Sequence, residues 1–72
     1  MMDAMPYESM VRGYRLKAGL SQEALAEQLG VSRQTIVNIE NGVNQPKVLL
    51  AIALGVALGV TVYELFREEL GQ

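Results

Sequence analysis

The sequence predicts an all-α fold of five helices in a single compact domain, and three observations support this prediction. Apolar residues recur at helical spacing, and no segment alternates apolar and polar side chains as a half-buried strand would. Proline and glycine divide the chain at intervals that suit short helices. Seventy-two residues bury only a modest core, so we expect one folded unit over residues 6–70, after a disordered N-terminus of residues 1–5.

The first helix is expected at about residues 7–18. Pro6 suits the first turn of a helix, because a backbone N–H at that position would have no partner within the helix. Val11 and Tyr14 are spaced to share one face. Gly19 follows them, and a glycine just past the last turn commonly ends a helix.

Two short helices, at about residues 22–29 and 33–40, begin with the same signal. Ser21 and Ser32 can each cap a helix by accepting a bond from an unpaired backbone N–H. The apolar residue before each serine can pack against another one turn into the helix, which pairs Leu20 with Leu25 and Val31 with Ile36. Gly30 lies in the short turn between them, so this segment predicts a helix-turn-helix.

A long apolar run marks the fourth helix, which we expect to begin at Pro46 and to end at about Leu58. The thirteen residues 48–60 are all apolar or glycine. A membrane-spanning helix needs roughly 20 such residues, so we interpret the run as a buried helix of a globular domain. Thr61 and Glu64 then form a capping box that opens a last helix at about residues 62–70.

Composition restricts the possible functions. The chain has no cysteine and no histidine, which excludes disulfides and thiolate metal sites and removes the commonest general base. It also lacks a glycine loop that could cradle a phosphate, so we expect no enzyme, no cofactor and no small-molecule ligand. The N-terminus has no basic region followed by an apolar run, so we expect a cytoplasmic protein without a membrane partner.

The net charge of −2 is unevenly distributed along the chain. Residues 12–47 carry five basic and three acidic side chains, a net charge of +2, whereas the two ends together carry −4. The acidic ends can point away from a polyanion while the middle faces it. An ordinary mixed surface without polarity is the alternative interpretation.

One face of the helix at residues 33–40 carries side chains that can read DNA. On a helical wheel Ile36 and Ile39 point towards the core, and the opposite face presents Arg33, Gln34, Val37 and Asn38. Arginine pairs with guanine, glutamine or asparagine pairs with adenine, and an apolar side chain can touch the thymine methyl group. A solvated polar face is the alternative.

These motifs resemble the phage repressor/Cro-like helix-turn-helix family, also called Xre-like regulators. The matching positions run without a gap from about Val11 to Phe66, and they include the segments 20–23, 29–32, 39–42 and 58–60. The resemblance implies a repressor-like DNA-binding domain. We interpret the chain as a homodimeric regulator of transcription, a repressor that reads a palindromic operator in double-stranded DNA.

The resemblance also implies roles for individual residues. Positions that match Arg33, Gln34 and Asn38 contact bases, and the position of Gln22 binds a phosphate at the helix N-terminus. The positions that hold the DNA backbone match Ser32, Thr35, Asn41 and Asn44, and the position of Asn44 sometimes contacts a base.

The family further pairs an arginine with a glutamate, here Arg15 and Glu40. Glu40 lies near the core side of its helix and needs a partner if it is buried, which agrees with this implication. Two unrelated surface charges are the alternative.

A stripe on the fourth helix predicts a dimer interface. Leu49, Ala53 and Val56 are apolar where relatives often have Glu or Lys, and their spacing aligns them on one side of the helix. The side of this helix that faces the core is already formed by Leu50, Ile52, Leu54 and Leu58. An adjoining face of small residues would let the backbones of two subunits approach closely, and it consists of Ala51, Gly55 and Gly59. The alternative is a tilted helix that buries the stripe inside the monomer.

Two rival functions stay open at this point. A DNA-binding antitoxin of a toxin–antitoxin pair would share the domain and use the apolar stripe to bind a toxin. A protein-interaction module without DNA binding is the other rival. The polar set of Gln22, Arg33, Gln34 and Asn38 argues against it.

Overall fold

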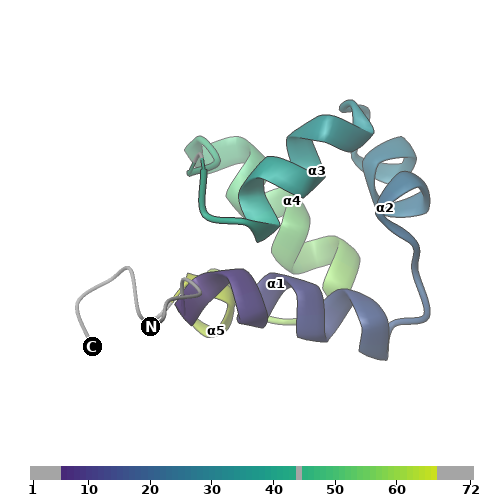
Figure 1. The fold of residues 1–72 in the computed structure, drawn as a ribbon. Coiled ribbons are helices and arrows are strands. Elements are labelled where there is room, and N and C mark those ends of the chain that lie inside the picture. Colours follow the sequence, from purple (N-terminus) through teal and green to yellow (C-terminus); the bar gives the residue numbers. More distant parts are fainter. Residues whose placement is uncertain (1–5, 44, 67–72) are drawn as a thin grey trace.

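The computed structural model describes residues 6–43 and 45–66, and the fold over these residues is entirely helical (Figure 1). The five helices are α1 (Pro6–Lys17), α2 (Gln22–Leu29), α3 (Arg33–Glu40), α4 (Val48–Leu58) and α5 (Val62–Phe66). The all-α class and the helix-turn-helix of α2 and α3 are as predicted. The expected disordered N-terminus, residues 1–5, and the expected end of the last helix, 67–70, lie outside the described residues.

The serine caps hold the beginning of both helices of the helix-turn-helix. The Ser21 hydroxyl accepts a bond of 2.9 Å from the backbone N–H of Ala24, and the Ser32 hydroxyl accepts one of 3.2 Å from that of Thr35. Gly30 ends α2 with a φ of 72°, a left-handed conformation that glycine adopts without steric cost. Local residues therefore determine where both helices begin and where the turn between them lies.

The helix α4 begins at Val48, two residues later than predicted. Lys47 occupies the N-cap position, and its side chain makes no capping bond. Its backbone is extended, and the first helical bond runs from the N–H of Ala51 to the Lys47 carbonyl at 2.9 Å. Pro46 therefore precedes the helix instead of starting it. Within the described residues, no helix is long and apolar enough to cross a membrane.

The capping box predicted for α5 is present. The backbone N–H of Thr61 donates to the Glu64 carboxylate at 3.0 Å, and the N–H of Glu64 donates back to the Thr61 hydroxyl at 3.0 Å. Because each side chain satisfies an otherwise unpaired backbone donor, this short helix has a defined beginning.

The helices contact one another in a closed ring around the core. In the order of contact, α1 packs on α3, α3 on α2, α2 on α4, α4 on α5, and α5 on α1. Every helix contributes to the core, whose members are Val11, Leu25, Ala26, Ile36, Ile39, Ala51, Leu54, Leu65 and Phe66. Ile36 and Ile39 are buried as predicted, which turns the opposite face of α3 outwards.

Two small residues of α4, Ala51 and Gly55, pack inside the monomer. Ala51 and Gly55 are buried, and a Cβ atom added at Gly55 would lie 2.7 Å from the carbonyl oxygen of Val60. The absence of a side chain at Gly55 therefore lets the turn into α5 fold back onto α4. The expectation that these small residues adjoin a dimer contact is therefore wrong for Ala51 and Gly55, whereas Gly59 is exposed just past the end of α4.

Two glycine substitutions should change stability in opposite directions. Gly13 lies inside α1, is exposed, and has open space around its Cα, so Gly13→Ala should raise the free energy of unfolding by about 0.5–1 kcal/mol. Gly55→Ala should lower it by about 1–3 kcal/mol because the new methyl group clashes with backbone. Urea unfolding followed by circular dichroism measures both. Stabilisation by Gly55→Ala would contradict the close packing of this turn.

Candidate nucleic-acid interface

The four predicted base-reading residues lie together on the outer face of α3. Arg33 and Gln34 are exposed, and Val37 and Asn38 are half-buried. Gln34 Nε2 donates a bond of 3.0 Å to Asn38 Oδ1, which links the two amides across one turn of the helix. Val37, expected to be exposed, is partly covered, so its accessible part is smaller than the wheel suggested.

The residues predicted to hold the DNA backbone flank this face. The hydroxyls of Ser32 and Thr35 lie 2.9 Å apart at the N-terminus of α3, and Asn41 is exposed at its C-terminus. Asn44, the remaining residue of this set, lies outside the described residues. Both ends of α3 therefore carry polar groups at places where a DNA backbone beside the helix could reach them.

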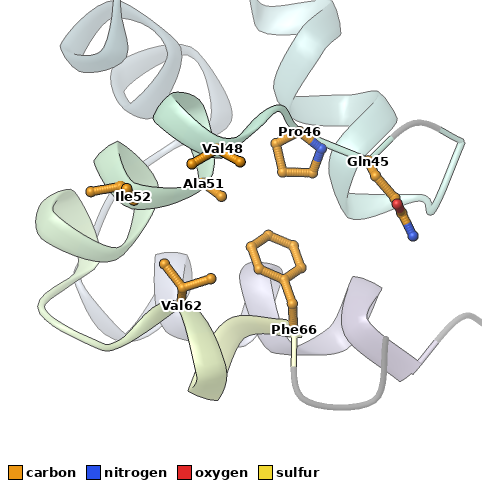
Figure 2. A pocket seen from close by; sticks show the side chains of 7 residues that line it. All are labelled: Gln45, Pro46, Val48, Ala51, Ile52, Val62 and Phe66. Carbon is orange, nitrogen blue, oxygen red and sulfur yellow. The ribbon is translucent and has the colours of Figure 1, made fainter. Parts of the chain in front are cut away.

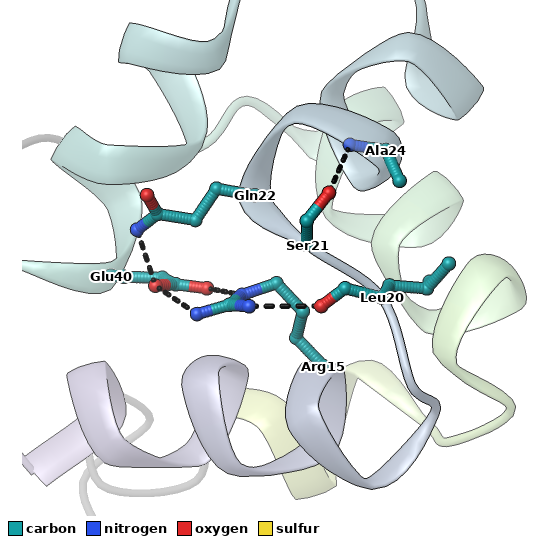
Figure 3. Close-up of polar contacts among 6 residues, drawn as sticks. All are labelled: Arg15, Leu20, Ser21, Gln22, Ala24 and Glu40. Atoms are coloured by element: carbon teal, nitrogen blue, oxygen red, sulfur yellow. Dashed lines mark hydrogen bonds and ion pairs between the residues drawn. The ribbon is translucent and has the colours of Figure 1, made fainter.

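Gln22, the predicted phosphate ligand at the start of α2, already has a partner in the free protein. Its Nε2 atom donates a bond of 3.0 Å to Glu40 Oε1 on α3, while the amide oxygen points away from Glu40 (Figure 3). Sequence reasoning missed this contact because it depends on how α2 and α3 pack.

The predicted ion pair of Arg15 and Glu40 is confirmed, and it is buried. Glu40 is 2% exposed and Arg15 is 6% exposed. Arg15 Nε bonds Glu40 Oε2, Nη2 lies 3.2 Å from Oε1, and Nη1 donates to the Leu20 carbonyl at 2.9 Å (Figure 3). The guanidinium thus joins α1 to α3 and to the segment that leads into α2. Because it is buried and paired, it adds little to the basic surface counted in the sequence.

The predicted dimer stripe faces solvent in the monomer. Leu49 is 81% and Val56 78% exposed, and Ala53 is half-buried. The alternative in which α4 tilts to bury the stripe is therefore wrong. Ile52, expected to face the core, is also about half exposed, and Val48 is exposed. The outer apolar face of α4 is accordingly wider than the three residues predicted.

This apolar face continues into a pocket between α4 and α5 (Figure 2). The pocket has a volume of about 250 Å³. It is lined mainly by apolar side chains, the full set being Gln45, Pro46, Val48, Ala51, Ile52, Val62 and Phe66. Val48 and Ile52 therefore belong both to the exposed face and to the pocket.

Comparison with known proteins identifies the family of this chain. A family model described as helix-turn-helix matches residues 11–65. An uncharacterised HTH-type transcriptional regulator of Methanothermobacter thermautotrophicus is 45% identical over 51 residues, which cover 71% of this chain and 74% of that protein. Similar regulators of Methanocaldococcus jannaschii and Bacillus subtilis are 41% and 37% identical, each over 82% of this chain and 89% of the relative.

The chain therefore belongs to the helix-turn-helix family of DNA-binding transcriptional regulators, and the predicted resemblance to phage repressor/Cro-like proteins is confirmed. Membership of this family of non-enzymes also agrees with the expectation that the chain is not an enzyme.

Replacing one partner of the buried ion pair should lower the free energy of unfolding much more than replacing both. Arg15→Met leaves the Glu40 carboxylate buried without its cation, so the free energy of unfolding should fall by about 3–5 kcal/mol. Combining it with Glu40→Leu should recover most of that loss, because two apolar side chains of similar size replace two charges. A double-mutant cycle by chemical denaturation measures the coupling, and additive losses would reject the pair as a unit.

Proposed function

We propose that this protein is a cytoplasmic homodimeric repressor that reads a palindromic operator with α3. The observation that carries this proposal is the outer face of α3, which groups an arginine, a glutamine and an asparagine beside a partly accessible valine. These side-chain types match the hydrogen-bonding groups and the methyl group of bases in the major groove. The burial of Ile36 and Ile39 holds that face outwards.

In the proposed complex, α3 enters the major groove and the polar groups around it hold the DNA backbone. Arg33 pairs with a guanine, and the linked amides of Gln34 and Asn38 meet adenines. Phosphate contacts come from Gln22 at the start of α2 and from the residues that flank the outer face of α3, namely Ser32, Thr35, Asn41 and Asn44. Phosphate contacts set the register, and base contacts set the sequence.

Dimerisation would join two such reading helices through the outer face of α4. Its most exposed apolar side chains are Leu49 and Val56, and their contact with water is unfavourable. They lie on a different helix from the outer face of α3, which we propose reads the DNA. In a twofold dimer this face meets its own copy. The two copies of α3 must then lie about 34 Å apart to reach successive major grooves. Occupancy of an operator by such a dimer would block RNA polymerase.

The apolar pocket beside α4 favours one second candidate, a DNA-binding antitoxin. In that case a toxin, instead of a second copy, would cover the outer face of α4 and fill the space between α4 and α5. A protein-interaction module that has lost DNA binding would use the same surface, and titration with non-specific DNA at low salt distinguishes it from both.

Arg33→Ala should weaken binding selectively. After selection of bound sequences from a random DNA pool, the variant should lose about 1–3 kcal/mol at one preferred guanine and tolerate other bases there. Arg12→Ala removes the same charge from the exposed surface of α1, so it is a matched control that should leave the preferred sequence unchanged. Fluorescence anisotropy with operator and substituted duplexes measures both. Equal sequence preference of Arg33→Ala and the parent would contradict the proposed docking.

A charge on the outer face of α4 should disrupt the dimer. Val56→Glu places a carboxylate at a position that is 78% exposed in the monomer, so folding should be preserved while association is lost. Leu16→Glu makes a comparable change at an exposed apolar residue of α1 and should stay dimeric. Sedimentation equilibrium at tens of micromolar compares them. A monomeric parent, or a folded and dimeric Val56→Glu, would show that α4 is not the interface.

A further inference from the structure

Three helices meet at one buried carboxylate, that of Glu40. Oε1 of Glu40 accepts bonds from Gln22 Nε2 on α2 at 3.0 Å and from Arg15 Nη2 on α1 at 3.2 Å. Oε2 accepts a bond from Arg15 Nε. At 2% exposure Glu40 is too deeply buried to touch DNA, yet it holds the side chain that the proposed function places on a phosphate (Figure 3).

This contact restricts what the Gln22 amide can do. A primary amide nitrogen carries two hydrogens, and Glu40 takes one of them. The second hydrogen stays available on the same nitrogen, whose position is now set by a buried acceptor. A glutamine side chain loses considerable rotamer freedom when it is immobilised. Because Glu40 restricts that freedom before DNA arrives, less of this loss remains at the moment of binding.

Arg15 makes the arrangement compatible with a polyanion. A lone carboxylate beside Gln22 would repel an approaching phosphate, and the repulsion would be strong near a protein interior. The guanidinium of Arg15 bonds both carboxylate oxygens and so neutralises this charge. It also donates to the Leu20 carbonyl at 2.9 Å, just before the Ser21 cap, and thereby holds the start of α2 from which the Gln22 side chain leaves.

We propose that the Arg15–Glu40 pair is a positioning device for a DNA contact as well as a link between helices. It holds the amide nitrogen of Gln22 so that its second hydrogen meets a phosphate of the bound duplex, and Arg15 and Glu40 themselves touch no DNA. This inference rests on the proposed function in one respect, the phosphate contact of Gln22.

A mutant cycle that uses DNA affinity as its readout tests the proposal. Gln22→Ala is made in the parent protein and in a protein that carries both Arg15→Met and Glu40→Leu, where apolar side chains replace the pair. In the parent it should weaken binding to every sequence roughly tenfold, as expected for a lost bond to a charged group. In the second background the same change should alter affinity less than about twofold, because the amide has already lost its anchor.

Gln28→Ala is the matched control, since Gln28 is an exposed glutamine near the other end of α2. It should leave affinity unchanged in both backgrounds. A tenfold loss from Gln22→Ala in both backgrounds would overturn the positioning role and leave the phosphate contact intact. No loss in the parent would overturn both the positioning role and the phosphate contact of the proposed function.

A measurement on the unmodified protein keeps the test decisive if the doubly substituted background does not fold. The side-chain amide protons of Gln22 are followed by nuclear magnetic resonance during titration with the operator duplex. We expect the proton bonded to Glu40 to keep its downfield shift and slow exchange while the other proton moves. Loss of the first signal's shift on DNA binding would show that Gln22 leaves Glu40 to reach the phosphate, which would overturn the proposal.

Discussion

The arrangement of this domain depends on the burial of one carboxylate. Glu40 lies almost fully inside a chain of 72 residues, where an unpaired charge would be costly. Arg15 supplies the opposite charge, and its third bond, to the Leu20 carbonyl, extends the constraint to the turn that precedes α2. The relative placement of α1, α2 and α3 is therefore coupled through a single polar cluster. Because Glu40 belongs to α3, the same cluster holds the helix that carries Arg33, Gln34 and Asn38 against α1 and α2.

The helix α4 presents the opposite problem to a buried charge, because it exposes apolar side chains to water. It is apolar nearly all round, and the ring of helices covers only part of it. Leu54 is fully buried, while Leu49 and Val56 remain in contact with water. Among the described residues, α2 and α5 pack on α4 and leave its outer side exposed. Reading and association would thus use different helices, and a protein bound to α4 would leave α3 accessible to DNA.

Local signals in the sequence were sufficient to predict most of the fold. The Ser21 and Ser32 caps, the left-handed Gly30 and the capping box at Thr61 each act over a few residues, so neighbours along the chain determine them. Helical periodicity alone predicted that Ile36 and Ile39 are buried, because two residues three apart share a face. The Arg15–Glu40 pair is different, since it was inferred from resemblance to a family and from the cost of burying a charge.

By itself, then, the sequence determined the helices of the described residues, their all-α class and the helix-turn-helix, and it predicted the side chains of α3 that we propose contact DNA. The tertiary structure decided the contacts and the burial that arise when segments distant in the sequence pack together. The bond from Gln22 to Glu40 joins residues 18 apart and exists only because α2 and α3 cross at that point. Gly55 could be assigned to the inside of the monomer only once the turn into α5 was placed against it. Periodicity tells which residues share a face of a helix, but which faces are covered follows from the positions of all the other helices.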